Sequence, residues 1–579
     1  MLSLFLTHLE GYKKDAVKSP ILIILEVICE LLLPLVMAEI VDVAIPSGDV
    51  GYIFKMGALM LVLAAFSMTC GVLAAKYAAY ASQGFGGNLR QHMFDKVQEF
   101  SFADIDRFSS ASLITRMTND VNAMTMMLAM GLRMLVRAPV MLIAALAVSL
   151  YLNAQLAVIL LIIIPLMALG IVVLMKICSK LFEAMQKRID GLNNVLQENL
   201  VAIRVVKAFV REGYEKTKFQ KANDDLTRSA LAAVLRVLFM QPIMMTTLNV
   251  CIVLVLWFGG KYVVGGAMLT GDLYSFTTYI MNVLFSVLMV AMTLLQLTRA
   301  RACAQRINEV LDTAPDIRDS DNCRDRALPE SRGSVEFQNV NFKYVATGTG
   351  DDVLHGIDLK IEPGQFVAVV GGTGVGKSSL VNLIPRFYDV TGGAVLVDGV
   401  DVRDYPIDEL RHRIGMVLQN NVLFSGTIRE NLLWGDPEAT EEQMIQAAKN
   451  AQAYDFVMSF PEGFDTYIEQ GGVNVSGGQK QRLCIARAML RHPSILILDD
   501  STSAVDSATE AEIRKSFSEN LKGTTVIIIA QRISSVRYAD KIVVLDDDHI
   551  AGVGTHDELM ASNHIYQEIY ASQQEGVSE

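Results

Sequence analysis

The residues from Gly371 to Ser378 have the types and spacing of a loop that binds phosphate. They read Gly-Gly-Thr-Gly-Val-Gly-Lys-Ser, which matches the pattern GxxxxGK[ST], and an apolar β-run at 366–370 precedes them. Glycines let backbone N–H groups turn inward around phosphate oxygens, and the N-terminus of the following helix adds positive potential. We therefore predict that Lys377 binds the β- and γ-phosphates of ATP and that Ser378 binds Mg²⁺. The predicted nucleotide-binding residues of this loop are Gly371, Gly372, Thr373, Gly374, Val375, Gly376, Lys377, Ser378 and Ser379.

A second motif, Ser494-Ile-Leu-Ile-Leu-Asp499-Asp500, is typical of a buried parallel strand that ends in carboxylates. Open α/β sheets bind their ligands at this carboxyl edge of the strands. We therefore predict that Asp499 holds Mg²⁺ through water. The two motifs together predict ATP hydrolysis, or conformational switching driven by ATP.

Between the two motifs lies Val475-Ser476-Gly477-Gly478-Gln479, which ends 20 residues before Asp499. With this segment in this position the sequence resembles the ATP-binding-cassette (ABC) family, and Ser-Gly-Gly-Gln resembles the signature motif of that family. The resemblance covers nearly the whole chain, because residues 111–121 and 206–215 are similar to the cytoplasmic arm segments of ABC exporters. It implies that two ATPase domains close head to tail on two ATP molecules. Each site then joins the phosphate loop of one domain to the signature of the other.

The resemblance also implies roles for single residues. Tyr344 matches the aromatic residue that stacks on adenine, Gln419 matches the glutamine that senses Mg²⁺ and the membrane domain, and Ser503-Ala-Val-Asp506 matches the D-loop. The residues implied for the site on a partner domain are Ser476, Gly477, Gly478, Gln479 and Asp506. The residues implied for Mg²⁺ are Ser378, Gln419 and Asp499.

Two positions depart from the family pattern. A glutamate that acts as general base or water-positioning residue usually stands where Asp500 stands, and a histidine that contacts the γ-phosphate usually stands where Gln531 stands. Aspartate reaches about 1.3 Å less far, and a misplacement of about 1 Å can cost about 10²-fold in rate. Glutamine can hydrogen-bond but carries no positive charge. With Asp500, Gln531 and Gln419 as its catalytic positions, the site is predicted to hold ATP and to hydrolyse it slowly.

This asymmetry between a weakened catalytic site and a nearly standard signature resembles the degenerate subunit of heterodimeric ABC exporters. The resemblance implies a second half-transporter subunit that carries the glutamate and the histidine, whose competent site the signature of this chain completes. A homodimer with two slow sites, and neutral drift at Asp500 and Gln531, are the alternatives.

The composition of the chain separates an apolar half from a polar one. Of its 579 residues 52% are hydrophobic and 19% charged, the mean hydropathy is +0.35, and the apolar excess lies in the first 300 residues. The net charge of −12 argues against nucleic acid as a partner, because no excess of basic residues neutralises phosphates. The seven cysteines are scattered and form no metal-spaced pair, so we expect buried thiols.

Six apolar segments are long enough to span a lipid bilayer as helices, at about 21–44, 56–78, 132–152, 155–175, 237–260 and 273–298. The long connections at 79–131 and 176–236 are helical in pattern, and the second is rich in lysine and arginine. Because basic residues stay on the inside, the N-terminus, both long connections and the ATPase half are predicted to be cytoplasmic, in a multi-pass protein of the cell membrane. Each long connection could form two helical arms; a separate small cytoplasmic domain is the alternative.

The predicted fold is thus an all-α six-helix transmembrane domain with long cytoplasmic helical arms, fused to an α/β ATPase domain. We expect an interfacial elbow at 1–20, the transmembrane domain at 21–310, a linker at 311–333 and the ABC nucleotide-binding domain at 334–575.

The sequence carries only a few signals for the transported substrate. Glu26 and Glu30 lie one helical turn apart inside the first span. Because a charged side chain within a membrane span is costly and usually has a functional role, the two residues are candidates for binding a cation. The alternatives are snorkelling of Glu26 toward the cytoplasmic end and an interhelical polar contact of Glu30. Several methionines on the last two spans suit a promiscuous apolar cavity or ordinary packing. The resemblance favours outward export of amphiphilic or hydrophobic compounds such as drugs. A homodimeric lipid or peptide exporter and an ATP-gated regulatory membrane protein are the competing functions.

Overall fold

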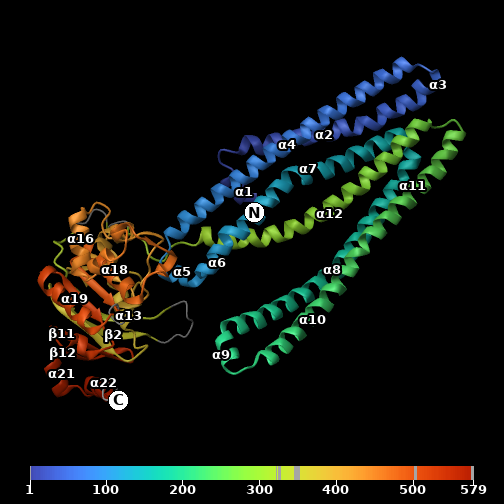
Figure 1. Ribbon diagram of the computed structural model, residues 1–579. Helices are drawn as coiled ribbons and strands as arrows, with labels where there is room; N and C mark the ends of the chain where they lie inside the picture. The colour runs from blue at the N-terminus through green and yellow to red at the C-terminus, as the bar shows by residue number, and fades with distance from the viewer. Residues whose placement is uncertain (1, 321–322, 324–327, 345–351, 501–504, 576–579) are drawn as a thin grey trace. The chain divides into compact units, whose positions relative to one another are not determined.

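The computed structural model describes residues 2–575 except 321–322, 324–327, 345–351 and 501–504. The chain divides into two compact units, each considered by itself (Figure 1). A membrane unit contains residues 2–96 and 111–313. An ATPase unit contains residues 97–110 and the described residues from Ala314 onward.

Six continuous helical stretches of the membrane unit are long and apolar enough to cross a bilayer, which confirms the predicted number of spans. The break between the third and fourth spans falls at Asn153, as predicted, because its side chain accepts a hydrogen bond from the backbone N–H of Leu156 (3.0 Å) and caps the next helix. The elements are α1 (Leu2–His8), α2 (Lys13–Glu39), the π-helix η1 (Ile40–Ala44), α3 (Ile45–Ser47), α4 (Val50–Gln98), α6 (Ser110–Thr115), the π-helix η2 (Arg116–Asp120), α7 (Val121–Leu152), α8 (Ala154–Val201), α9 (Ile203–Ala208), α10 (Glu212–Leu238), α11 (Met240–Val264) and α12 (Thr270–Asp312).

The second long connection forms a helical arm. Helices α8 and α10 run side by side, and the short helix α9 lies at their tip (Figure 1). Lys218 of α10 forms an ion pair with Glu198 of α8 (2.6 Å). At 1.5 Å per residue, the 48 residues of α8 extend about 70 Å, more than twice the hydrocarbon thickness of about 30 Å. The arm therefore continues far beyond the lipid.

Helices α2, α7 and α12 form the centre of the membrane unit. The hydroxyl of Tyr279 on α12 donates to the carbonyl of Leu31 on α2 (2.6 Å), and the hydroxyl of Ser275 donates to the carbonyl of Pro34 (2.6 Å). Both side chains are fully buried. These hydroxyls therefore find acceptors on backbone oxygens of α2, which a region without water requires.

The ATPase unit contains a six-stranded sheet in the order β12-β11-β3-β10-β9-β6, whose strands from β11 to β6 are parallel. Every residue of β9 and β10 is buried, as expected for a sheet covered on both faces. A second sheet has the order β2-β1-β4-β5, and β7 pairs with β8. The strands are β1 (Val335–Phe342), β2 (Leu354–Ile361), β3 (Phe366–Gly371), β4 (Gly392–Val397), β5 (Val400–Asp401), β6 (Ile414–Val417), β7 (Gly426–Thr427), β8 (Tyr467–Ile468), β9 (Ile495–Asp499), β10 (Thr525–Ile529), β11 (Lys541–Asp546) and β12 (His549–Gly554).

The helices of the ATPase unit pack around these sheets. They are α5 (Phe102–Phe108), α13 (Lys377–Asn382), α14 (Ile407–His412), α15 (Ile428–Leu433), α16 (Glu441–Asn450), α17 (Tyr454–Met458), α18 (Gly477–Leu490), α19 (Ser507–Asn520), α20 (Ile533–Val536), α21 (His556–Ser562) and α22 (His564–Glu575).

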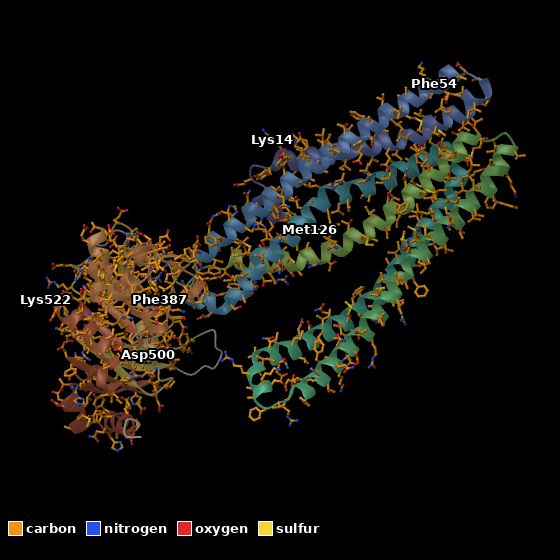
Figure 2. All side chains as sticks on the ribbon, in the orientation of Figure 1. Lys14, Phe54, Met126, Phe387, Asp500 and Lys522 are labelled. Carbon is orange, nitrogen blue, oxygen red and sulfur yellow. The ribbon has the colours of Figure 1, made fainter. Side chains whose placement is uncertain are left out.

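Helix α5 comes from the first long connection, which the sequence places in the transmembrane half, but it packs on the ATPase unit. The ring of Phe102 lies 4.5 Å from that of Phe387, and the hydroxyl of Tyr388 donates to the carboxylate of Asp106 (2.9 Å). Figure 2 labels Phe387 on this unit. Residues 97–110 are thereby tied to the ATPase fold by side chains that no motif marks.

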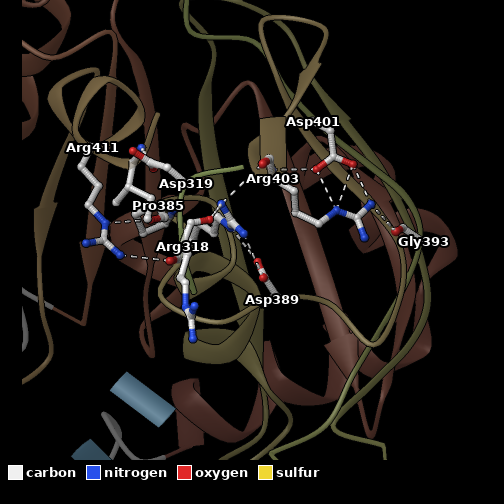
Figure 3. A network of polar contacts seen from close by, with 10 residues as sticks. Arg318, Asp319, Pro385, Asp389, Gly393, Asp401, Arg403 and Arg411 are labelled. Carbon is white, nitrogen blue, oxygen red and sulfur yellow. Dashed lines mark hydrogen bonds and ion pairs between the residues drawn. The ribbon is translucent and has the colours of Figure 1, made fainter. Parts of the chain in front are cut away.

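A buried arginine network holds the loop that receives α5. Arg386 is 6% exposed; it binds the carboxylate of Asp389 (2.8 Å) and reaches the carbonyl oxygens of Arg318 and Arg403. Arg411 donates to the carbonyl oxygens of Pro385 and Arg386 (Figure 3). Phe387 and Tyr388 therefore project from a loop whose backbone is fixed on both sides.

Candidate functional site

The predicted site residues come together at the carboxyl edge of the six-stranded sheet. The phosphate loop follows β3, Asp499 ends β9, and Gln531 lies two residues beyond β10, the strand between them. Gln419 lies two residues beyond β6, on the other side of β9, and is exposed. Parallel strands bring these four segments to one edge of the sheet, where open α/β sheets bind their ligands.

The glycines of the phosphate loop are required by its backbone. Gly374 and Gly376 have φ of +88° and +85°, a region that favours glycine. A Cβ atom on Gly376 would lie 2.9 Å from the carbonyl oxygen of Val353, and one on Gly371 would clash with the carbonyl of Leu545. The loop then enters α13 at Lys377, so the backbone N–H groups of a helix start face the space above the sheet.

Three side chains around this loop have the chemistry for a phosphate and a divalent cation. The ammonium group of Lys377 donates to the carbonyls of Gly371 and Gly372 and is half-buried, and this burial lowers its pKa while nearby Asp500 and Asp499 oppose the shift. The hydroxyl of Ser378 donates to the carboxylate of Asp499 (3.0 Å). Burial raises the pKa of Asp499, which is 4% exposed.

This donor set fits Mg²⁺. Mg²⁺ is commonly bound through a hydroxyl and one or two carboxylates, with substrate phosphates and water completing its shell. Ser378 and Asp499 supply two hard oxygen groups that already face each other. No cluster of three or more histidine, cysteine or acidic residues suited to a resident metal occurs among the described residues.

The two positions that depart from the family pattern bind each other. The side-chain amide of Gln531 donates to the carboxylate of Asp500 (2.8 Å), and Figure 2 marks Asp500 on the ATPase unit. Asp500 has a φ of +48°, which only a minority of non-glycine residues adopt. Burial is the largest cause of its raised pKa, which Lys377 and Gln531 partly offset. The sequence identified both residues but gave no sign that they form a pair.

A residue that sequence reasoning missed fixes the loop carrying Gln531. Gln573 on the last helix, α22, donates its amide to the backbone carbonyl of Gln531 (2.6 Å) and accepts from the backbone N–H of Ile533 (2.8 Å). A glutamine near the end of a helix carries no sequence signal for such a role.

The predicted signature opens helix α18. Ser476 is the N-cap, its hydroxyl accepts from the backbone N–H of Gln479 (3.3 Å), and the Gln479 side chain accepts from the N–H of Ser476 (2.9 Å). This capping box holds Gly477 and Gly478 in the exposed first turn. The backbone N–H groups of this turn are thus held in a helix start that a phosphate can approach.

The remaining predicted residues lie around this edge. Asp506 caps α19 through the N–H of Thr509 (3.0 Å), while Ser503 and Ala504 of the predicted D-loop lie outside the described residues. The hydroxyl of Tyr344 hydrogen-bonds that of Ser379 on α13 (2.9 Å). The Tyr344 ring packs edge-on against Tyr388 (5.1 Å). Tyr344 therefore connects the phosphate helix to the loop that contacts α5.

Within the membrane unit, the two glutamates of the first span share one partner. The guanidinium of Arg137 on α7 forms ion pairs with Glu26 and with Glu30, the latter at 2.7 Å. The interhelical contact that stood as the alternative to cation binding for Glu30 is therefore present, and it involves Glu26 as well. Arg137 was missed, although a basic residue directly before the charge-free run 138–175 is a costly group that requires a counter-ion.

Comparison with known proteins places this architecture. A family model described as the ABC transporter transmembrane region matches residues 17–288, and one described as ABC transporter matches residues 354–503. The chain is 39% identical to an uncharacterised ABC transporter ATP-binding protein of Bacillus subtilis, YfiB, over 98% of both chains. The chain is an ABC transporter.

Other relatives of the transporter have more specific names. A putative multidrug export ATP-binding/permease protein of Bacillus subtilis, YgaD, is 32% identical over 98% of both chains. An ATP-dependent lipid A-core flippase of Syntrophus aciditrophicus is 34% identical over 87% of this chain and 83% of its own. The structure of a bacterial Atm1-family ABC exporter with ATP bound superposes with a TM-score of 0.80 at 25% identity, over 97% of this chain and 98% of that one. The transporter thus has the exporter fold, with ATPase activity coupled to transport.

Proposed function

We propose that the transporter is one subunit of an ATP-driven exporter for amphiphilic or hydrophobic compounds. Its own site binds ATP and hydrolyses it slowly, and its signature completes a faster site on a second, different subunit. The observation that carries this proposal is the pair Asp500–Gln531 next to an intact phosphate loop and a capped signature helix.

Different side chains of the site have different roles in binding and hydrolysing ATP. Lys377 and the loop N–H groups bind the triphosphate, and Ser378 and Asp499 hold Mg²⁺, which would supply charge neutralisation at the phosphates. Asp500 occupies the position of the family's water-orienting glutamate, but its side chain is shorter than glutamate and its carboxylate is engaged by Gln531. Binding without efficient water activation favours long-lived ATP and a closed pair of ATPase domains.

Two exposed apolar surfaces support a second subunit. The tip of the α8–α10 arm exposes Phe209 (73%) and Val210 (79%). The ATPase unit has a groove beside β6 and α18 in which the rings of Phe424 and Trp434 stack at 4.4 Å, both of them exposed. Apolar surface of this kind is typical of protein contacts. We propose that the arm tip of each subunit docks in the groove of the other.

The same proposal implies which side of the membrane each part of the transporter faces. The N-terminus, the arms and the ATPase unit face the cytoplasm, where ATP is available, and the six spans lie in the cell membrane.

A lipid exporter is the second candidate function, because a relative of 34% identity is named as a lipid A-core flippase.

Reconstitution of the chain with the subunit that co-purifies with it tests the proposal. The assembly should hydrolyse ATP faster when substrate is added and should accumulate an amphiphilic dye, rather than a labelled lipid, in inverted vesicles. Lys377→Ala should reduce transport less than the same change in the partner's phosphate loop, because only the partner's site turns over quickly. Equal losses from the two changes would contradict the asymmetry, and ATP-dependent closure without accumulation would instead support a regulatory protein.

A further inference from the structure

Glu30, one of the two ion-paired glutamates, lines a cavity between three helices of the membrane unit. Glu30 of α2 and Arg137 of α7 form its polar wall together with Asn282 and Ser286 of α12. Met134, Ala138, Met141, Phe285 and Met289 form the rest of the lining. Its volume is about 290 Å³, close to the lower end of small-molecule sites.

The two glutamates are not equivalent. The Glu26 side chain is 15% exposed, and its carboxylate lies against α4 at Gly71, where a Cβ atom would come within 3.1 Å of it. Glu26 is absent from the cavity wall, whereas Glu30 faces the cavity and is 34% exposed. Glu26 is therefore the enclosed counter-ion of Arg137, and Glu30 is the carboxylate that a ligand can reach.

The charges of this group do not balance. Two carboxylates share one guanidinium, and no other ion pair to Glu26 or Glu30 occurs in the part of the chain that the structure describes. Glu30 is nine positions after Ile21, where the apolar run begins, so it lies about 14 Å into the span, near the middle of a hydrocarbon core of about 30 Å. One excess negative charge at this depth is costly unless a bound proton or a bound cation neutralises it.

The remaining residues of the cavity wall favour one kind of cation over another. Thioether sulfurs and the exposed ring of Phe285 contact organic cations favourably and solvate a small inorganic ion poorly.

We propose that this cavity binds one organic cation, such as a quaternary ammonium compound, with its charge at the Glu30 carboxylate and its apolar part against the methionines and Phe285. The inference rests on the proposed export function and names the class of substrate for it. Arg137 tunes the affinity, because it cancels one of the two negative charges.

Binding of labelled benzyltrimethylammonium to the transporter and its co-purified partner in nanodiscs tests this site without requiring transport. Glu30→Gln should weaken binding at least tenfold, because it leaves the group neutral, and Arg137→Gln should strengthen it at least tenfold. The double variant Glu30→Gln/Arg137→Gln restores a charge of −1 but carries it on the enclosed Glu26, so its binding should lie between that of Glu30→Gln and that of the wild type. Arg133→Gln removes the same charge one turn earlier on α7, outside the cavity wall, and is the matched control that should change nothing.

Two controls keep the outcome specific. ATP binding at the phosphate loop should persist in every variant, which separates a folding defect from a lost ligand. The neutral carbon analogue neopentylbenzene should compete poorly with the cation in the wild type. Loss of binding in both single variants, or competition by the neutral analogue at equal strength, would overturn the proposal. Cation binding that follows the charge order without vesicle accumulation would uphold the site and refute export.

Discussion

The contact between Asp500 and Gln531 predicts that restoring glutamate at position 500 alone will not restore hydrolysis. The Gln531 amide nitrogen lies 2.8 Å from the carboxylate oxygen of Asp500. A glutamate reaches about 1.3 Å further, so with both backbones fixed it would leave only about 1.5 Å between the two atoms. Because that is far below a hydrogen-bond distance, the longer side chain must turn away or displace Gln531.

The expected rates follow from this geometry. A correctly placed carboxylate is worth about 10²-fold, so Asp500→Glu/Gln531→His should raise hydrolysis at this site by about that factor. Asp500→Glu alone, without a partner that fits it, should gain about tenfold or less. Gln531→His alone should gain no more, because the short Asp500 remains. The two changes are thus expected to be strongly non-additive, as is common for residues in contact.

Single-turnover hydrolysis measures this site alone when the partner's own phosphate-loop lysine is replaced by alanine. Adding Lys377→Ala to the double variant should abolish the gain, which assigns the activity to this chain. A full 10²-fold gain from Asp500→Glu alone, or simple additivity of the two changes, would refute the view that the two residues are matched to each other.

Two further predictions concern segments outside the phosphate loop. Tyr388→Phe removes the hydrogen bond to Asp106 on α5 but keeps the ring, so it should preserve ATP binding and lower the stimulation of ATPase activity by substrate several-fold; unchanged stimulation would exclude this contact from coupling. The rings of His8 on α1 and His92 on α4 face each other through their Nδ1 atoms (2.6 Å), and burial, together with His92, lowers the pKa of His8 below 6.5 although Glu10 opposes the shift. Because detached α1 binds a proton more readily, the contribution of this contact to the docking of α1 is full above pH 6.5 and weakens as the pH falls from 6.5 through the lowered pKa. Hydrogen exchange of residues 2–12, corrected for the intrinsic rate, should therefore increase on acidification, and the same increase in His8→Gln would contradict this role.

The sequence predicted those parts of the transporter that depend on local pattern. Charge-free apolar runs mark the spans because lipid excludes charge, and the phosphate loop is recognisable because only glycine fits its backbone at positions such as Gly376. Single contacts between segments distant in the chain were not predictable. Arg137 meets Glu26 across 111 positions, and Tyr388 meets Asp106 across 282. Neither pair follows any period, so only the folded chain shows them.

The trapping of nucleotide by vanadate tests the central claim most directly. Azido-ATP labelled on the base and on the γ-phosphate is added to the transporter with its co-purified subunit, and each chain is then analysed for the nucleotide that it retains. We predict ADP trapped with vanadate on the partner and uncleaved ATP on this chain, which Lys377→Ala should remove. ADP trapped equally on two identical chains, or no ATP bound at the Lys377 loop, would contradict a pair of unequal sites formed between two different subunits.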